Sequence, residues 1–360
     1  MRCYLETKNF SMVYDRKDNS YDELRFLLAL MVLYVHSYAL LYGEKIADPF
    51  TKIANFQVGL GSLSVYGFFV LSGFFMIQSL ESNNSIKIYF KNRVLRIIPA
   101  FWMSLLLSSF VIVPLLANVF DVKSALDFTV KSGFFHAFGY AWTINGAFPF
   151  NPIVDGINGS MWTLKHEIGL YMLLPLFVYL THNSRRLLLI MFSIFFILSV
   201  ANITTKFTLF NIPCCMAWIF SINEYPSFIY FSTYFFAGVI FYKYRENIIV
   251  SKRIWLILLI FFLLAIFFGN LKIISLFTLP YLILVAGATI KKRFFSSKGD
   301  YSYGMYIYAF PIQQVVVHLY KNELNVWSFF ALSSCITLCI SIVSWHYFEK
   351  RILKLKNKSI

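Results

Sequence analysis

Residues 24–42 read LRFLLALMVLYVHSYALLY, and this apolar run decides the fold. A run of this length is enough for one helix to cross the hydrocarbon core of a bilayer. His36 lies about twelve residues inside the run. Because an ionisable side chain within a membrane helix costs free energy, such a residue indicates a functional site. His36 is therefore the first candidate for chemistry.

Two roles are open for His36 on this pattern alone. A neutral imidazole can take a proton from a hydroxyl, return it to a leaving group, or briefly carry an acyl group. Alternatively, the ring is structural and binds a carbonyl group of a neighbouring helix. On a helix, Arg25 lies on the same face, with His36 about 16 Å deeper. This face therefore runs from a cation to a buried imidazole.

The composition places the whole chain in a membrane. Of 360 residues, 59% are hydrophobic, 20% are aromatic and only 14% are charged. These values exclude a soluble globular domain and predict an all-α, polytopic helical bundle. Residues 1–23 are polar and have no small-residue cleavage site, so we expect the first span to direct insertion.

Ten apolar runs are long enough to cross a membrane, which predicts about ten transmembrane helices. They cover residues 24–42, 62–80, 98–117, 163–181, 186–203, 226–243, 253–269, 271–290, 302–320 and 326–348. Two weaker segments, 124–143 and 207–221, contain charges or prolines and are expected to be interfacial or re-entrant.

The distribution of Lys and Arg predicts the orientation. With a cytoplasmic N-terminus, the cytoplasmic segments hold 23 of the 32 Lys and Arg residues, and the opposite loops hold 7. Cytoplasmic loops carry the excess of positive charge, so both termini are expected in the cytoplasm. The net charge of +15 follows from these loops and does not indicate nucleic acid. With no repeat or long linker, residues 1–360 are expected to form one membrane domain.

A pair of arginines precedes the third expected span on the cytoplasmic side. Arg93 and Arg96 are three residues apart, so on a helix they share one face. Guanidinium groups bind phosphate oxygens well, and a coenzyme A thioester carries several phosphates. The alternative is an ordinary basic anchor against anionic lipid headgroups.

The sequence SMWTLKHE, residues 160–167, opens the fourth expected span from the outer side. Ser160 is expected to cap the helix, and Glu167 is a carboxylate close to the outer membrane interface. Glu167 could orient His36 or bind the hydroxyl groups of an acceptor. Alternatively, it interacts only with the dipole at the start of its helix.

The long outer stretch, residues 118–161, contains His136, Trp142, Asp155 and the FPF sequence at 148–150. These aromatic and polar groups could stack on and hydrogen-bond a sugar. An aromatic belt at the membrane interface explains them equally well.

Two further patterns have ordinary explanations. The sequence GFFVLSGFF at 67–75 places small residues inside a span, which indicates close helix packing. His346 and Glu349 could supply two metal ligands, but no third and fourth ligand follow at a typical spacing. We therefore predict no metal site.

Taken together, the motifs resemble the acyltransferase-3 family of integral membrane acyltransferases. They occur in order along the chain as Leu24-Arg25 with Ala29 and His36, the sequence FFVLSGF at 68–74, Arg93-x-x-Arg96 with Pro99, Trp162-Thr163-Leu164-x-x-Glu167 with Tyr171 and Pro175, and the sequence YSYGMYIY at 301–308. Each motif is weak alone, but their shared order on ten spans is specific.

The resemblance implies that acetyl-CoA, or another acyl-CoA, in the cytoplasm donates to a glycan hydroxyl across a bacterial inner membrane. The expected acceptor is a surface polysaccharide such as O-antigen, or its lipid-linked precursor. Catalytic roles fall to His36 and Glu167. Three arginines, Arg25, Arg93 and Arg96, are expected to bind the donor. Two aromatic residues, Trp162 and Tyr303, are expected to contact the substrate.

Two departures from the family pattern matter. Phe26 stands where many members have Gly, and Ala309 stands where many have a histidine. His36 is therefore the principal catalytic candidate. Some relatives append a soluble domain, and none is expected here because the chain stops at Ile360. Two other functions fit the same residues: a transporter or flippase for a lipid-linked sugar, and an acyltransferase for a small-molecule acceptor.

Overall fold

The computed structural model describes residues 8–43, 46–83, 85–136, 141–205, 225–292, 294, 298–320 and 323–357. Within these residues the chain is mostly helical and has almost no sheet, which confirms the all-α prediction. The described strands are β1 (Lys8–Asn9) and β2 (Ile249–Val250), which pair antiparallel. The weak segment at 207–221 lies outside the described residues.

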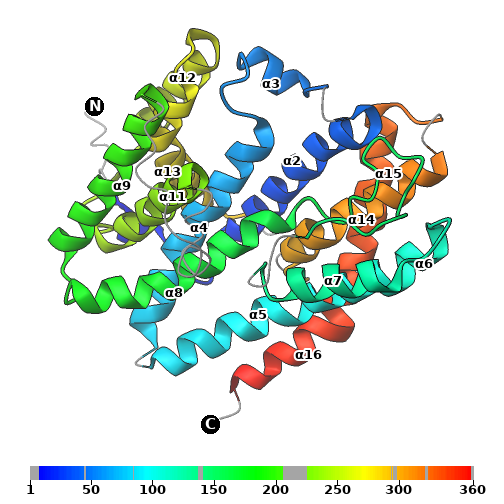
Figure 1. Ribbon diagram of the computed structural model, residues 1–360. Helices are drawn as coiled ribbons and strands as arrows, with labels where there is room; N and C mark the ends of the chain where they lie inside the picture. Colours follow the sequence, from blue (N-terminus) through cyan, green and yellow to red (C-terminus); the bar gives the residue numbers. More distant parts are fainter. Residues whose placement is uncertain are drawn as a thin grey trace. The chain divides into compact units, whose positions relative to one another are not determined.

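Helices occupy all ten expected spans (Figure 1). They are α2 (Tyr21–Tyr42), α4 (Leu60–Ser82), α5 (Ile86–Leu107), α8 (Leu164–Leu180), α9 (Arg185–Thr205), α11 (Tyr225–Lys243), α12 (Lys252–Phe268), α13 (Leu271–Thr289), α14 (Ser302–Tyr320) and α15 (Val326–Ser344). Short elements connect or extend them: α1 (Phe10–Val13), α3 (Pro49–Ile53), α6 (Val113–Leu116), α7 (Val122–Gly133), α16 (Lys350–Leu353), the π-helices η1 (Ser108–Ile112) and η4 (Trp345–Glu349), and the 3-10 helices η2 (Met161–Thr163) and η5 (Lys354–Asn357).

Six of the described helical segments are long and apolar enough to cross a membrane. They are Tyr21–Tyr42, Leu60–Ser82, Ile86–Leu116, Arg185–Thr205, Leu271–Thr289 and Val326–Lys356. Two other expected spans, α8 and α12, are shorter at 17 residues each. The chain is therefore a multi-pass membrane protein, while the count of ten spans and the side of each terminus stay predictions.

The third expected span begins earlier than residue 98. Helix α5 starts at Ile86, so Arg93 and Arg96 lie inside a helix and not in a loop before it. Helical structure then continues through η1 and α6 to Leu116. The first three turns of α5 carry polar residues among apolar ones, so they do not form a continuous apolar run. The apolar run therefore marks only the later part of the helix.

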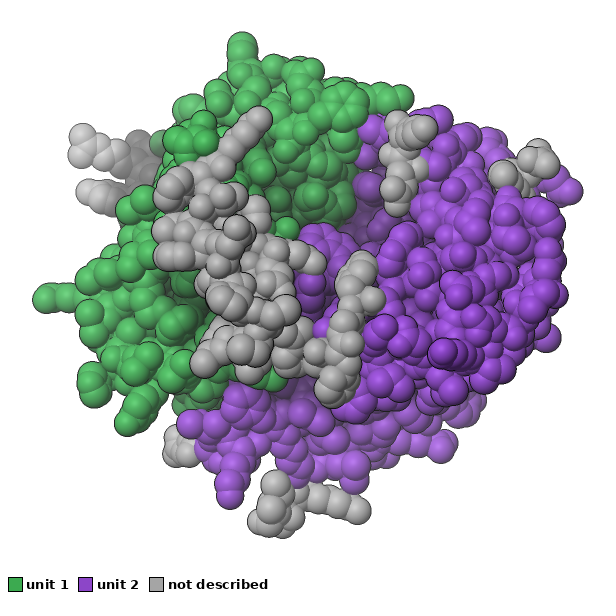
Figure 2. Space-filling model, in the orientation of Figure 1, with its two compact units in different colours: residues 1–25, 50–84, 167–296 green, residues 26–49, 85–166, 297–360 purple. Residues whose placement is uncertain are grey.

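By internal packing, the chain divides into two compact units (Figure 2). Unit 1 comprises Met1–Arg25, Phe50–Asn84 and Glu167–Ser296, and unit 2 comprises Phe26–Pro49, Ser85–His166 and Ser297–Ile360. Helices α2 and α8 contribute residues to both units. Each unit is described by itself below.

In unit 1, helices α4 and α11 pack with their backbones in contact. A Cβ atom on Gly73 would overlap the carbonyl of Phe235, and one on Gly238 would overlap the carbonyl of Val70. The prediction of close packing at GFFVLSGFF is confirmed. The N-terminal segment is less polar than expected, since Phe10 is fully buried and its ring meets Phe74 edge-on at 5.8 Å.

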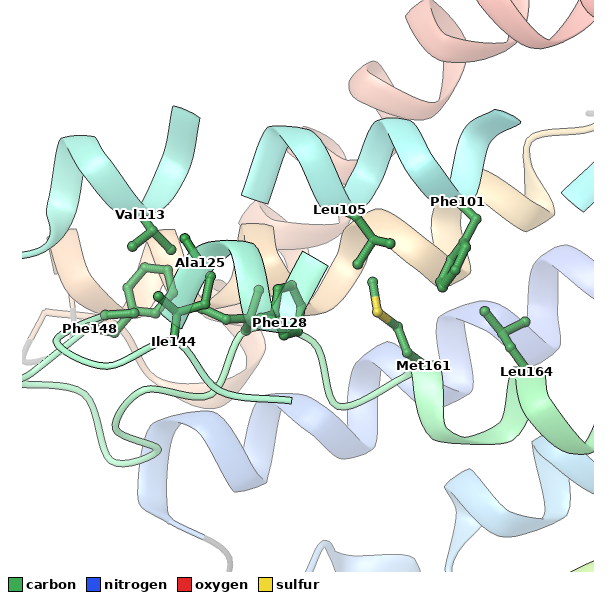
Figure 3. Packing of buried hydrophobic residues seen from close by; sticks show 11 residues of the cluster. Phe101, Leu105, Val113, Ala125, Phe128, Ile144, Phe148, Met161 and Leu164 are labelled. Carbon is green, nitrogen blue, oxygen red and sulfur yellow. The ribbon is translucent and has the colours of Figure 1, made fainter. Parts of the chain in front are cut away.

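In unit 2, side chains from the described parts of the outer stretch, 118–136 and 141–161, pack into the core. Figure 3 shows Phe148 and Met161 packed with residues of α5 and α7, including Leu105 and Phe128. Phe148 is 1% exposed, so the interpretation in which the aromatic rings of this stretch stack on a sugar does not hold for this ring. Packing the apolar ring against other apolar side chains removes it from water, which stabilises the fold. Phe150, two residues on, is 69% exposed.

Candidate active site

His36 lies on α2 in unit 2, with its imidazole against α14. The ring meets Phe310 edge-on, with centroids 5.2 Å apart and an interplanar angle of 82°. Nδ1 of His36 is buried and has no hydrogen-bond partner among the described residues. The structural alternative, a hydrogen bond between the ring and a carbonyl group of a neighbouring helix, is not observed at Nδ1 among these residues. A catalytic role for His36 stays a prediction.

Arg96 of α5 is held by charges and rings of unit 2. Its guanidinium pairs with Asp300 at 2.5 Å and with Glu349 of η4 at 3.4 Å. It also lies over the rings of Tyr303, 5.6 Å from the centroid, and Trp345, 5.4 Å from the centroid. Two carboxylates and two aromatic faces therefore fix the guanidinium group.

Further cations lie close to Arg96. Arg93 is one turn earlier on α5, and Lys356 of η5 interacts electrostatically with both arginines and with Asp300. The elements that carry Lys356 and its neighbours, η5 and α16, pack on α5. Three cations thus gather around two carboxylates, which leaves a net positive charge for a phosphate-bearing ligand.

One face of α14 connects the arginine cluster with His36. Tyr303, which contacts Arg96, and Phe310, which contacts His36, are seven residues apart. On an α-helix this spacing is two turns, or about 10 Å, on the same face. The predicted donor residue and the predicted catalytic residue therefore meet the same helix face at two levels.

A proline in α14 fastens neighbouring segments to this face. Pro311 has no backbone N–H, so the carbonyl of Ile307 loses its helical donor. Ser104 of α5 donates to this carbonyl at 3.1 Å, and Asn158 of the outer stretch donates at 2.8 Å. Both hydrogen bonds replace the missing helical donor at the carbonyl of Ile307. The bond from Asn158 also holds the outer stretch beside Phe310.

The expected helix start at Ser160 is only partly confirmed. Ser160 lies before η2, but its hydroxyl makes no capping hydrogen bond, because a 3-10 turn intervenes before α8 begins at Leu164. Its carbonyl instead accepts a hydrogen bond from Tyr306 at 2.9 Å. Trp162 is 36% exposed and meets His166 edge-on, while the Tyr303 hydroxyl donates to the carbonyl of Ile97 at 3.0 Å.

Two further predicted residues belong to unit 1. Arg25 pairs with Asp22 at 2.7 Å and lies over the ring of Phe75, 4.6 Å from its centroid. Glu167 accepts a hydrogen bond from Ser72 at 3.2 Å and another from the hydroxyl of Tyr171. Both side chains are thus fixed within unit 1, and the predicted pairing of Glu167 with His36 stays a prediction.

His346 and Glu349 have different partners. Nε2 of His346 lies 3.1 Å from the hydroxyl of Tyr301, whereas Glu349 faces Arg96 and accepts from Ser344 at 3.0 Å. Among the described residues, no group of three His, Cys, Asp or Glu side chains is placed to hold a metal ion.

Several polar residues around the site were not among those predicted from the sequence. Asp300 and Ser104 gave no signal, because their partners are distant in sequence. Gln313 and Gln314, both fully buried in α14, did carry a signal: adjacent amides within a membrane span are costly and indicate a specific role.

The fold and these residues define a multi-pass helical membrane protein. One face of its helix α14 contacts both a buried imidazole, His36, and an arginine cluster at Arg96. The sequence model of the acyltransferase-3 family, described as an acyltransferase domain, matches residues 18–346. The chain therefore belongs to the acyltransferase-3 family and is an acyl-transferring enzyme.

Two relatives match over nearly their full length. An O-acetyl transferase of Shigella phage Sf6 is 28% identical over 347 residues, which cover 94% of this chain and 96% of the relative. Nodulation protein 10 of Rhizobium leguminosarum bv. viciae is 22% identical over 370 residues, covering 95% of each chain. No solved structure matches significantly.

Proposed function

We propose that this protein transfers an acetyl group from cytoplasmic acetyl-CoA to a hydroxyl of a bacterial surface polysaccharide, such as O-antigen, or of its lipid-linked precursor. It would act in the inner membrane. The observation that carries the proposal is the single face of α14, which contacts Arg96 through Tyr303 and His36 through Phe310. The phage relative, described as an O-acetyl transferase, supports acetyl as the group transferred.

The donor phosphates would bind at Arg93 and Arg96, with Arg25 as a further cation. Arg96 already holds two carboxylates, so a phosphate must share its guanidinium with Asp300 or displace the more distant Glu349. Arg93 and Lys356 keep the cluster net positive during that exchange. A phosphate group can therefore compete with Glu349 for the guanidinium of Arg96, because it carries more negative charge than a carboxylate.

His36 would carry the chemistry. As general base it takes the proton of the acceptor hydroxyl while the hydroxyl oxygen attacks the thioester carbonyl. The carbon–sulfur bond then breaks, and the coenzyme thiolate leaves and takes the proton from the imidazolium. In the covalent variant, the imidazole nitrogen attacks the thioester carbonyl and the coenzyme thiolate leaves. The hydroxyl oxygen then attacks the acetyl carbon, the carbon–nitrogen bond breaks, and the hydroxyl proton passes through the freed imidazole to the thiolate. Either route needs a ring nitrogen without a structural hydrogen bond, as Nδ1 is in the described chain.

Three other residues would support the reaction. Glu167 would hold the acceptor or orient the imidazole, with its carboxylate fixed by Ser72 and Tyr171. Trp162, which is partly exposed, would stack on a sugar ring, and Tyr303 would contact the donor beside Arg96.

The O-acetyl content of the surface glycan tests the proposal. It is measured by NMR in cells that express wild type, His36→Ala or His182→Asn at equal membrane levels. His182 is the matched control, because it is exposed and lies in the turn after α8. We expect wild type and His182→Asn to acetylate and His36→Ala to fail. Full acetylation by His36→Ala would remove the proposal.

A further inference from the structure

Two adjacent amides, Gln313 and Gln314, are fully buried in α14. Gln314 joins this helix to the outer stretch. Its Nε2 donates to the carbonyls of Ile153 at 2.9 Å and Gly156 at 2.7 Å, and its Oε1 accepts from Asn151 at 2.7 Å. Both of its N–H donors and its oxygen have partners in the outer stretch, so Gln314 is a structural link.

Gln313 instead joins α14 to the turn of α2 that carries His36. Its Nε2 donates to the carbonyl of Leu33 at 3.0 Å and to the hydroxyl of Ser37 at 2.9 Å. The Ser37 hydroxyl in turn donates to the same carbonyl at 2.9 Å. Leu33 is three residues before His36, and Ser37 follows it directly. The amide of Gln313 therefore bonds to both ends of the turn from Leu33 to Ser37, and this turn contains His36.

The same part of α14 also touches the imidazole. Phe310, one turn before Gln313, meets the ring of His36 edge-on. A rotation of α2 by one residue would turn His36 by about 100° away from this contact. Two directional hydrogen bonds from Gln313 oppose that rotation, whereas apolar packing alone permits neighbouring rotational settings.

Stability alone does not explain an amide at this position. Oε1 of Gln313 is buried and has no hydrogen-bond partner among the described residues. A buried carbonyl oxygen without a partner destabilises a fold, and a methionine of similar size would avoid that cost. The two donors on Nε2 are therefore what distinguishes glutamine from an apolar residue here.

We propose that Gln313 is a positioning residue, which sets the rotation of α2 so that the imidazole of His36 faces the reacting groups. This inference rests on the proposed catalytic role of His36. It predicts that losing the amide lowers turnover without weakening the fold or the binding of the donor.

The experiment compares Gln313→Met with wild type in proteoliposomes, using radiolabelled acetyl-CoA and lipid-linked glycan from cells that lack the gene. We expect an unchanged or higher Tm, a KM for acetyl-CoA within about twofold, and a kcat reduced about tenfold, since small misplacements of catalytic groups cost this much. A purely structural role would give the opposite: a lower Tm with wild-type kcat per folded molecule, which would overturn the inference.

Ser37→Ala provides a second, milder test. It removes one of the two acceptors of the amide, so kcat should fall by about threefold, and adding it to Gln313→Met should cause no further loss. If Gln313→Met does not fold, Gln313→Leu, which is also apolar and lacks the donors, should show the same loss of kcat. Wild-type kcat in both Ser37→Ala and Gln313→Leu would overturn the inference.

The control His36→Ala separates the two proposals. If His36→Ala is active, the proposed function fails and the role of Gln313 falls with it. If His36→Ala is inactive while Gln313→Met keeps wild-type kcat, only the positioning role is wrong.

Discussion

The ring of Phe310 meets the imidazole of His36 edge-on, with centroids 5.2 Å apart. In this arrangement Phe310 limits the orientation of the imidazole from one side. Because the contact joins α14 to α2, the side chain that fixes His36 belongs to the helix that also contacts Arg96 through Tyr303.

Replacing Phe310 with Leu should lower activity more than stability. The substitution keeps apolar bulk but removes the ring edge, so we expect a loss of about 1–2 kcal/mol in the free energy of unfolding and a several-fold lower kcat. Phe329→Leu is the matched control, because Phe329 is fully buried in the same cluster. The control should lose similar stability and keep its kcat; equal kcat in both variants would contradict the role of Phe310.

Arg93→Ala should weaken donor binding. Loss of one charge-assisted phosphate contact should raise the KM for acetyl-CoA by about tenfold and leave kcat nearly unchanged. Steady-state kinetics in proteoliposomes measure both constants, with Arg253→Ala at the start of α12 as a control arginine. An unchanged KM for Arg93→Ala would mean that Arg93 is only a membrane anchor.

Arg96→Ala should destabilise the protein as well as weaken donor binding. Glu349 is 4% exposed, and Arg96→Ala removes its salt-bridge partner. Breaking a buried ion pair in this way costs about 3–5 kcal/mol. The double variant Arg96→Ala with Glu349→Gln should recover the membrane level but not the KM for acetyl-CoA. Recovery of both would show that Arg96 has only a structural role.

Gly73→Ala should prevent folding of unit 1. The new methyl group would overlap the carbonyl of Phe235, and backbone atoms cannot move aside as a flexible side chain can. Gly269→Ala is the control: it has open space around it but a φ of 89°, so it should cost only about 1 kcal/mol. Membrane levels by fluorescent fusion would compare them, and equal levels would contradict the close packing of α4 and α11.

The sequence predicts the helices well, because a long apolar run in a membrane leaves the backbone few alternatives. The ten expected runs are all helical, and α4 packs closely on α11 at Gly73, as expected. Predictions failed where tertiary packing decides. Phe148 looks like a sugar-binding ring in the sequence, but α5 and α7 bury it.

Site residues divide in the same way. His36, Arg93 and Arg96 are visible in sequence because charges and imidazoles in apolar surroundings are rare. The partners of Arg96 are not visible, since Asp300 and Glu349 lie 204 and 253 residues further along the chain. Gln313 is the intermediate case: its burial could be read from the span, but its bonds to Leu33 and Ser37 depend on how α2 packs on α14.

We propose that His36 carries out the acetyl transfer. This role is tested most directly by single-turnover transfer in proteoliposomes, with radiolabelled acetyl-CoA on one side and unacetylated lipid-linked glycan as acceptor. Wild type and His182→Asn should label the glycan, and His36→Ala, with the same Tm, should slow the reaction at least about a hundredfold, as expected for loss of a general base. Labelling of the glycan by His36→Ala at the wild-type rate would contradict the claim.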